Sequence, residues 1–332
     1  MSNKILLNEK IFIAGAAGMA GSAISRMLKK AGYGQSINDG IILTPSRKEL
    51  DLMNVEAVKS WFQVNKPTIV ILAAARVGGI FANSTQPASF LLDNIKIQVN
   101  VIEQAWLCGV KRLLFLGSSC IYPKFAQQPI REESLLKGAL EVSNESYAIS
   151  KIAGIKLCES LRIQYGFDAI SLMPTNLYGP GDNYHLTQGH VMAALIRKFC
   201  EAVKESAPSV TCWGSGSPMR EFLHVNDLGD AAVFALEHWD PGSSNAPLCD
   251  LGKPLTFLNV GTGVDLSIRN LAEKIAKSAG FTGEILWDKN KPDGTPKKQL
   301  DINRLKGLGW KASIKIDEGI NETVSSYKSN FM

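Results

Sequence analysis

The sequence has no long hydrophobic run. None of its apolar stretches approaches the roughly 20 residues that a membrane-spanning helix needs. The N-terminal segment MSNKILLNEK also lacks the extended apolar core of a signal peptide. These absences argue against a membrane protein and against a secreted one, so we expect a cytoplasmic protein.

The chain also lacks clustered metal or disulfide ligands. Its six cysteines are scattered, without a C-x-x-C pair and without a Cys/His cluster. This distribution favours free thiols in a reducing compartment and predicts no metal site. The cysteines are Cys108, Cys120, Cys158, Cys200, Cys212 and Cys249.

A strong excess of one charge is absent too. The net charge of +5 suits an anionic small ligand, but the sequence contains no polybasic run. We therefore expect neither nucleic acid nor a membrane surface as a partner. Internal repeats and low-complexity segments are also missing from the sequence.

Short apolar segments alternate with amphipathic ones along the first half of the chain. The apolar segments predict strands, and the stretches between them predict helices. Such alternation is typical of an α/β fold, a Rossmann-type doubly wound sheet of parallel strands. Because ligands bind beyond the carboxyl ends of parallel strands, Gly15, Ala73, Ser118 and Pro174 should line one crevice. The predicted strands are residues 10–14, 41–44, 68–73, 112–117 and 168–173.

The composition of the sequence changes after Pro174, where turn-forming residues become frequent. We predict a nucleotide-binding domain over residues 1–180 and a smaller, mixed α/β substrate-binding domain over 181–332. The boundary is expected to be interleaved, with residues 220–240 returning to the first domain.

A glycine-rich turn directly follows the first predicted strand. It reads G-A-A-G-M-A-G and leads into an amphipathic stretch. Glycines in such a turn let the backbone approach a pyrophosphate, which then faces the N-terminus of the following helix. We therefore assign cofactor binding to Gly15, Ala16, Ala17, Gly18, Met19, Ala20 and Gly21.

The second strand indicates which dinucleotide binds. An acidic residue at the end of this strand would accept the ribose hydroxyls of NAD. Here residues 41–43 lead into T-P-S-R-K-E-L, where Arg47 is placed to pair with a 2′-phosphate and Glu49 lies further along. The pattern predicts NADP(H).

Tyr147 and Lys151 lie four residues apart, so a helix would place them on one face. A lysine ammonium beside a phenol favours the phenolate and is expected to lower the pKa of Tyr147. Such a tyrosine can exchange a proton with a carbinol or ketone oxygen. Ser118, which follows the apolar run 113–116, is placed to supply a second hydrogen bond.

With these motifs assembled, the chain resembles the extended short-chain dehydrogenase/reductase family. The resemblance rests on the glycine turn, Ser118, the Tyr147/Lys151 pair and N-L-Y-G-P-G at 176–181, and it covers nearly the whole chain. More specific matches are V-G-G-I at 77–80, G-S-S-C-I-Y-P-K at 117–124, W-G-S-G-S-P-M-R-E-F-L-H-V at 213–225 and K-P-D-G-T-P-K-K at 291–298. In two positions, Ala17 and Lys198, a member of the family carries arginine instead.

The resemblance implies roles for individual residues. Tyr147 is the catalytic acid of ketone reduction, Ser118 assists it, and Lys151 binds the nicotinamide ribose. Cys120 and His190 form an epimerisation pair, with His190 also near the cofactor. Further cofactor contacts are implied for Leu116, Gly117, Ser118, Ser119, Pro174, Thr175, Asn176 and Leu177. The substrate nucleotide is implied to meet Lys198, Trp213, Arg220 and Asp293.

The activity implied by the resemblance has two steps on a GDP-linked 4-keto-6-deoxy sugar. C3 and C5 are epimerised, and C4 is then reduced with NADPH. The alternatives are a sugar-nucleotide 4-epimerase or 4,6-dehydratase, or a non-catalytic nucleotide sensor. Dehydratases of the family carry an Asp-Glu pair where this chain has Ser119 and Cys120, and a sensor would usually lose Tyr147 or Lys151.

The resemblance also implies a homodimer that forms through helices including the one that carries Tyr147. Three apolar residues of that helix are candidates for the interface, although they fit the protein core equally well. They are Ile152, Ile155 and Leu157.

Overall fold

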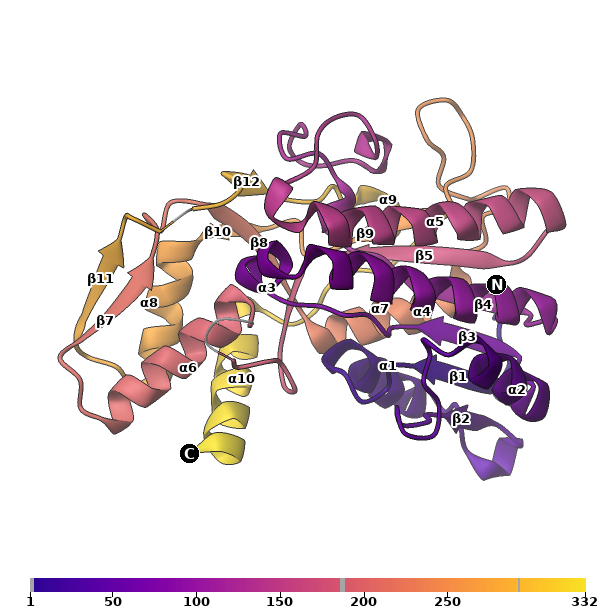
Figure 1. Cartoon of the computed structure of the whole chain (residues 1–332), viewed down its shortest axis with the longest axis horizontal. Coiled ribbons are helices and arrows are strands. Elements are labelled where there is room, and N and C mark those ends of the chain that lie inside the picture. Colours follow the sequence, from indigo (N-terminus) through magenta and orange to yellow (C-terminus); the bar gives the residue numbers. More distant parts are fainter. Residues whose placement is uncertain (1–2, 186–188, 292) are drawn as a thin grey trace.

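The computed structural model describes residues 3–185, 189–291 and 293–332. In it the chain packs as two units, a larger one around a six-stranded sheet and a smaller one that contains the C-terminal helix (Figure 1). The predicted α/β fold is confirmed.

The six strands of the large sheet all run parallel, in the order β2-β1-β3-β4-β5-β9. The strand order reverses between β1 and β3, which is where doubly wound sheets bind nucleotides. The strands are β2 (Ile41–Leu43), β1 (Lys10–Ala14), β3 (Ile69–Leu72), β4 (Arg112–Leu116), β5 (Ala169–Pro174) and β9 (Phe257–Val260).

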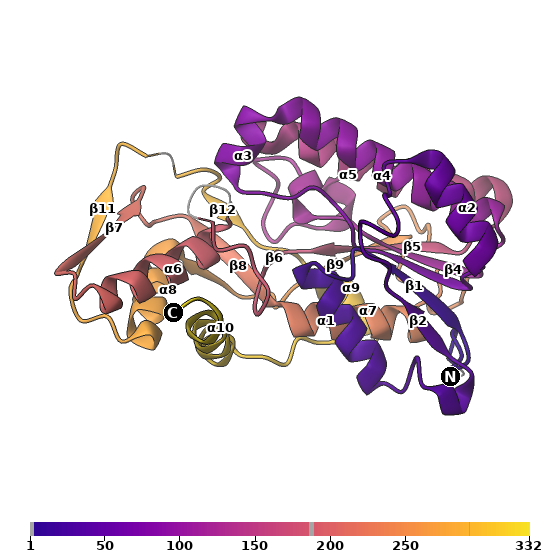
Figure 2. The same ribbon diagram turned by 60° about the horizontal axis from the view of Figure 1, so that its bottom comes forward.

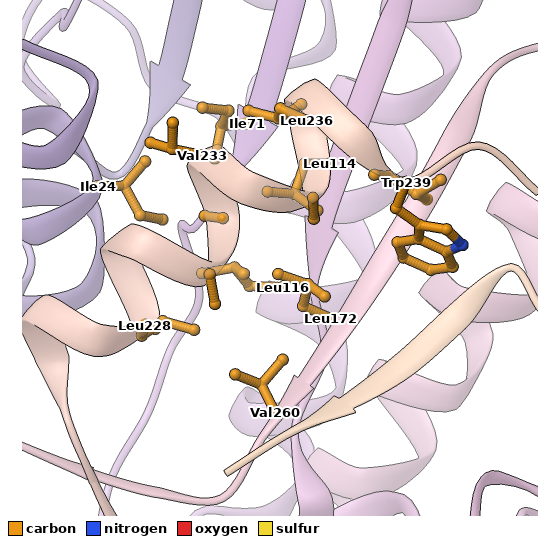
Figure 3. Packing of buried hydrophobic residues seen from close by; sticks show 14 of the residues in the cluster. Ile24, Ile71, Leu114, Leu116, Leu172, Leu228, Val233, Leu236, Trp239 and Val260 are labelled. Carbon is orange, nitrogen blue, oxygen red and sulfur yellow. The ribbon is translucent and has the colours of Figure 1, made fainter. Parts of the chain in front are cut away.

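Helices cover both faces of this sheet (Figure 2). One face packs against α2 (Val55–Asn65), α4 (Pro87–Leu107) and α5 (Glu145–Tyr165). The other packs against α1 (Met19–Lys30), α7 (Val225–His238) and α9 (Asn303–Gly307). Figure 3 shows the second core, where Leu228, Val233 and Leu236 of α7 lie over side chains from β3, β4, β5 and β9. Because both faces are buried, the strands read as continuous apolar runs.

The smaller unit has its own core. Its helices are α6 (Val191–Lys204), α8 (Ile268–Ala279) and α10 (Ile316–Phe331), and β7 (Ser209–Trp213) pairs with β11 (Glu284–Asp288). A separate sheet of short strands lies between the two units. It consists of β6 (Asn176–Tyr178), β8 (Met219–His224), β10 (Asp265–Ser267) and β12 (Lys297–Lys298).

The five predicted strands occur within about one residue of their expected ends, but several short elements were not predicted. Helix α3 (Ile80–Thr85) and strands β6, β8, β10, β11 and β12 carry little periodic signal, since they contain only two to six residues each. Short 3-10 turns occupy Ser36–Asn38, Ser119–Ile121, Glu132–Ser134 and Val142–Asn144.

The division at residue 180 misplaces one strand. β9 lies beyond that residue, yet it pairs with β5 and completes the large sheet. All four residues of β9 are buried. A short buried run does not show from the sequence which sheet it joins, because that depends on the edge strand with which it pairs. Within the described residues, no helix is long and apolar enough to cross a bilayer.

Gly154 allows α5 to lie close to β4 and to α4, and these contacts set the position of α5. A Cβ atom at Gly154 would lie 2.5 Å from Oε1 of Gln98 and 2.6 Å from the ring of Phe115. Both side chains are buried, so neither can move aside freely.

We predict that Gly154→Ala lowers the free energy of unfolding by about 1–3 kcal/mol, because overpacking outweighs the gain in helix propensity. Chemical denaturation measures this change. The control is Gly307→Ala in α9, where nothing lies within 4 Å of the added atom, and stability should be unchanged or slightly higher. Equal effects of the two substitutions would contradict the packing argument.

Candidate functional site

A deep cleft of about 1350 Å³ runs from the carboxyl edge of the large sheet to the smaller unit. Cavities that hold one small ligand usually measure roughly 300–1,000 Å³, so this cleft has room for two. Gly15, Ala73, Ser118 and Pro174 all line it, as predicted from their places after strand ends.

The glycine turn forms one end of the cleft. Gly15 has φ +88°, and a Cβ atom there would lie 2.7 Å from the backbone of Ala74. A Cβ atom at Gly21 would lie 2.2 Å from the Gly15 carbonyl oxygen, which is a clash. Helix α1 begins beyond Gly18 without a side-chain cap and without an acidic residue in its first turn. Its first N–H groups are therefore free for an anion, and the turn fits a dinucleotide pyrophosphate.

The turn that follows β2 lines the cleft together with the glycine turn. Arg47 is exposed and lines the cleft. The Glu49 carboxylate instead accepts a hydrogen bond from the Ser46 backbone N–H at 2.7 Å, which lowers the pKa of Glu49. This bond holds the Glu49 carboxylate within the turn. Arg47 and Asp51 are the charged residues of the segment after β2 that line the cleft, and of these Arg47 is the cation.

Ser118 and Tyr147 lie at the middle of the cleft. Ser118 follows β4, and Tyr147 lies in the first turn of α5. Loss of hydration raises the pKa of Tyr147 above its ordinary value, the nearby Cys120 raises it further, and a hydrogen bond with Ser118 lowers it. The phenol is therefore protonated at neutral pH and can act as a proton donor.

Lys151 corrects one expectation. Its Nζ lies 5.9 Å from the centre of the Tyr147 ring, as the spacing requires, but it is buried and donates to the Leu116 carbonyl at 2.7 Å. Burial lowers the pKa of Lys151 to about 7. The prediction that its charge lowers the pKa of Tyr147 is wrong for this structure, because burial dominates both groups.

Cys120 has two polar neighbours that the sequence did not reveal. The Lys298 ammonium donates to the Cys120 sulfur at 3.6 Å, and the Asn144 side-chain amide donates at 3.3 Å. An ammonium and an amide donor together stabilise negative charge on sulfur. Lys298 belongs to K-P-D-G-T-P-K-K, but no spacing rule links it to a cysteine 178 positions earlier in the chain.

His190 is the N-cap residue of α6 in the smaller unit, without a capping bond from its side chain, and it lines the same cleft. It keeps contact with solvent, yet the surrounding wall of the cleft lowers its pKa, and the nearby Lys298 lowers it further. Lys298 is therefore close to both members of the predicted epimerisation pair.

The far end of the cleft is aromatic and basic. Trp213 is 52% exposed, with Lys198 Nζ 5.7 Å and Lys291 Nζ 5.3 Å from its ring. Such a surface suits a nucleobase next to phosphates. Arg220 also lines this end, and Asp293 accepts two hydrogen bonds from Ser215. Lys291 was not identified from the sequence.

The cleft brings together all but two of the predicted site residues. Leu116 and Lys151 lie behind its wall, where the lysine is bonded to the leucine carbonyl. Across the described ranges, no group of three His, Cys, Asp or Glu side chains is arranged to hold a metal ion.

Comparison with known proteins gives a consistent result. Residues 11–247 match the NAD dependent epimerase/dehydratase family. The chain is 49% identical over 324 residues to a GDP-L-fucose synthase of Escherichia coli strain K12, with 97% of each chain covered.

Two solved structures are also similar. One is a GDP-6-OMe-4-keto-L-xylo-heptose reductase from C. jejuni, with a TM-score of 0.89, 35% identity and 98% and 99% of the chains covered. The other is a GDP-L-fucose synthetase from Naegleria fowleri bound to NADP, with a TM-score of 0.85, 26% identity and 98% and 96% covered.

The buried lysine predicts a pH dependence of stability. The pKa of Lys151 is about 7 in the native protein against an ordinary value of 10.5, so between these values the unfolded chain binds more protons. The contribution of Lys151 to the free energy of unfolding therefore rises as the pH increases from 7 towards 10.

We predict that Lys151→Met is more stable than the wild type by a few kcal/mol at pH 7, at about 1.4 kcal/mol per pKa unit, less the lost hydrogen bond. The difference should shrink towards pH 10. Unfolding at both pH values measures it, with Lys156→Met on the exposed face of α5 as the control. A difference that does not change with pH would contradict the prediction.

Proposed function

The chain belongs to the NAD dependent epimerase/dehydratase family, and we propose that it converts GDP-4-keto-6-deoxy-D-mannose to GDP-L-fucose. The reaction consists of epimerisation at C3 and C5 followed by reduction of the C4 ketone. The observation that carries this proposal is the arrangement of one cleft wall. It holds a proton donor for the ketone, Tyr147 with Ser118, and beside it a cysteine paired with a lysine, Cys120 with Lys298.

The chain uses NADP(H), which supplies the hydride for C4 when it is bound. The turn at 15–21 would hold the pyrophosphate on the free N–H groups of α1. Arg47 would pair with the 2′-phosphate, and residues 116–119 and 174–177 would line the nicotinamide.

In the reduction, Tyr147 delivers a proton to the C4 oxygen as the hydride reaches C4. Its raised pKa keeps this proton in place until the ketone oxygen gains negative charge. Ser118 donates a second hydrogen bond to the same oxygen. Lys151 holds the end of β4 through the Leu116 carbonyl, two residues before Ser118.

In the epimerisations, Cys120 removes the proton next to the ketone and His190 returns one. The ketone acidifies the C–H bonds at both C3 and C5, so one pair of groups can serve both centres. Inversion needs removal from one face and delivery to the other, and the two residues belong to different units of the fold. The lowered pKa of His190 makes its protonated form the stronger acid.

The dehydratase alternative lacks its carboxylate. Where that chemistry needs an acidic pair, this chain has buried Ser119 and the cleft residue Cys120. The sensor alternative is disfavoured because Tyr147 and Lys151 are both retained and adjacent.

The nucleotide of the substrate would occupy the far end of the cleft. Its base would stack on Trp213, and Lys198, Lys291 and Arg220 would neutralise the diphosphate. Asp293, already bonded to Ser215, would fix the loop around the base.

The proposal includes a cytoplasmic homodimer. All six cysteines are free thiols, which suits a reducing compartment. Ile152 and Ile155 are buried in the core and Leu157 packs against it, so the candidate interface lies elsewhere on α4 and α5. Exposed apolar side chains there are Leu92, Val99, Leu107, Ile149, Ile163 and Tyr165. The mass of the particle in solution tests this arrangement.

Arg47→Ala should weaken NADPH binding more than NADH binding, by about 1–3 kcal/mol, the scale of a charge-assisted hydrogen bond. Titration of both cofactors by fluorescence or calorimetry measures the difference. Lys48→Ala is the control, since Lys48 is exposed next to Arg47 but does not line the cleft. Equal losses for both cofactors in the Arg47 variant would remove Arg47 from this role.

The two half-reactions should separate in deuterated water. Without NADPH, the wild type should incorporate deuterium at C3 and C5 of the keto sugar, and Cys120→Ser and His190→Asn should each lose most of it. Tyr147→Phe should keep the exchange but lose roughly 10²–10⁴ in the rate of reduction. NMR follows the exchange, and NADPH oxidation follows the reduction. A cysteine variant that exchanges at the wild-type rate would place the base elsewhere, and reduction without any exchange would leave only a C4 reductase.

A further inference from the structure

Glu221 is a fully buried carboxylate that lies next to the substrate cleft without lining it. It follows Arg220 in β8, so the alternation of the strand turns it away from the cleft. Burial raises its pKa. Within the described ranges no cation pairs with it, and its side-chain bonds come instead from backbone N–H groups and one hydroxyl.

These bonds join two separate segments. One carboxylate oxygen accepts from the N–H groups of Thr262 and Gly263, at 2.6 and 2.7 Å. The other accepts from the N–H of Leu300 at 2.8 Å. Gly261 is part of the same arrangement, because a Cβ atom there would overlap the Glu221 carboxylate.

The second bond fixes the segment that carries Lys298. Strand β12 contains only Lys297 and Lys298 and pairs with Met219 and Arg220 of β8. A two-residue strand has few ladder bonds of its own, so bonds beyond it hold its outgoing end. The bond from Leu300 to Glu221 is one of them, beside the bond from Gln299 to Gln128 and the backbone pairing of residues 299 and 301 with Ile130. Lys298 in turn lies 3.6 Å from the Cys120 sulfur.

The cofactor side of the cleft depends on a different part of Glu221. Its backbone carbonyl accepts from the side chains of Thr175 at 3.2 Å and Asn176 at 2.8 Å. A substitution that changes only the side chain keeps these bonds. The carboxylate therefore acts on β12, whereas the backbone acts on the cofactor wall.

We propose that Glu221 is a positioning residue for the epimerisation half-reaction, because it holds β12 where Lys298 meets the Cys120 sulfur. This inference rests on the proposed function, in which the Cys120/Lys298 pair removes protons from the sugar. Besides Lys298 of β12, the charged and titratable groups near Cys120 are Arg220 of β8 and Tyr147 and Lys151 of α5.

The test uses Glu221→Gln in the full chain. The glutamine amide would place an NH₂ group against the N–H of Leu300 or against those of Thr262 and Gly263, so one of the two links is lost. The readout is alkylation of Cys120 by iodoacetamide between pH 6 and 10, followed by mass spectrometry of the peptide that contains it. This readout does not require turnover.

Two further variants serve as the reference and the control. Lys298→Met removes the ammonium itself. Asp227→Asn is the matched control, because Asp227 is also buried and accepts from Ser313 and Ile314, yet it lies on α7 away from Cys120. Glu221→Gln and Asp227→Asn should both lower the melting temperature. If only Glu221→Gln changes the alkylation of Cys120, the change reflects the position of Lys298 and not a general loss of stability.

Lys298→Met should slow the alkylation of Cys120 by roughly tenfold or more, because it removes the ammonium next to the sulfur. Glu221→Gln should slow alkylation as well, and Asp227→Asn should leave the rate unchanged. Glu221→Gln should also slow deuterium exchange at C3 and C5 about tenfold or more, while oxidation of GDP-L-fucose by NADP⁺ stays within about threefold.

A Glu221 variant that is alkylated at the wild-type rate, alongside a slower Lys298 variant, would overturn the inference alone. A Lys298 variant that is alkylated at the wild-type rate would overturn the Cys120/Lys298 pair and with it the part of the proposed function on which the inference rests. If Glu221→Gln does not fold, Glu221→Asp decides, since its shorter side chain keeps the charge but cannot reach both segments. It should then slow alkylation to a smaller degree, and the wild-type rate would overturn the inference.

Discussion

The parallel direction of the six strands in the large sheet governs the rest of this structure. Because every strand runs the same way, every carboxyl end opens at one edge, and the chain must cross back through a helix before each new strand. Residues as distant in sequence as Gly15, Ser118 and Pro174 thus meet in one cleft.

The same constraint explains why the smaller unit is not an independent appendage. β9 lies beyond the first elements of the smaller unit yet completes the large sheet, and the short strands β8 and β12 each lead from the smaller unit back towards the larger one, into α7 and α9. These two short strands deliver charged residues to the cleft, Arg220 from β8 and Lys298 from β12. The interleaving therefore builds the site, and a simple cut of the chain into two domains would divide it.

Sequence reasoning identified the parts of the site that rest on local patterns. The glycine turn, Ser118 and the Tyr147/Lys151 spacing each lie within one strand-to-helix connection or one helix turn, so their geometry follows from nearby residues. Lys298 and Asn144 could not be found in this way, because they reach Cys120 through tertiary folding alone. The resemblance to a family supplied Cys120 and His190, which no periodicity would have joined.

The electrostatic prediction for Tyr147 failed for a related reason. Spacing on a helix shows which side chains are neighbours, but it does not show how much water they keep. Burial raises the pKa of Tyr147 and lowers that of Lys151, so both are biased towards their neutral forms. A helical wheel shows that Tyr147 and Lys151 are neighbours, but it does not show that burial removes water from both.

The contrast between these two groups and Cys120 shows how one cleft can serve two chemistries. Reduction needs an acid that keeps its proton until the hydride arrives, and the desolvated phenol of Tyr147 meets that need. Proton abstraction needs a group whose negative form is stabilised, and Cys120 has an ammonium and an amide donor against its sulfur. In the proposed function both groups lie next to the same ketone, so a sugar could pass from one reaction to the other without leaving the site. Environments that push neighbouring groups in opposite directions assign the acid and the base. In this fold those environments come from different elements, α5 for the phenol and β12 for the ammonium. The two are linked through Cys120, which contacts the ammonium and also raises the pKa of Tyr147.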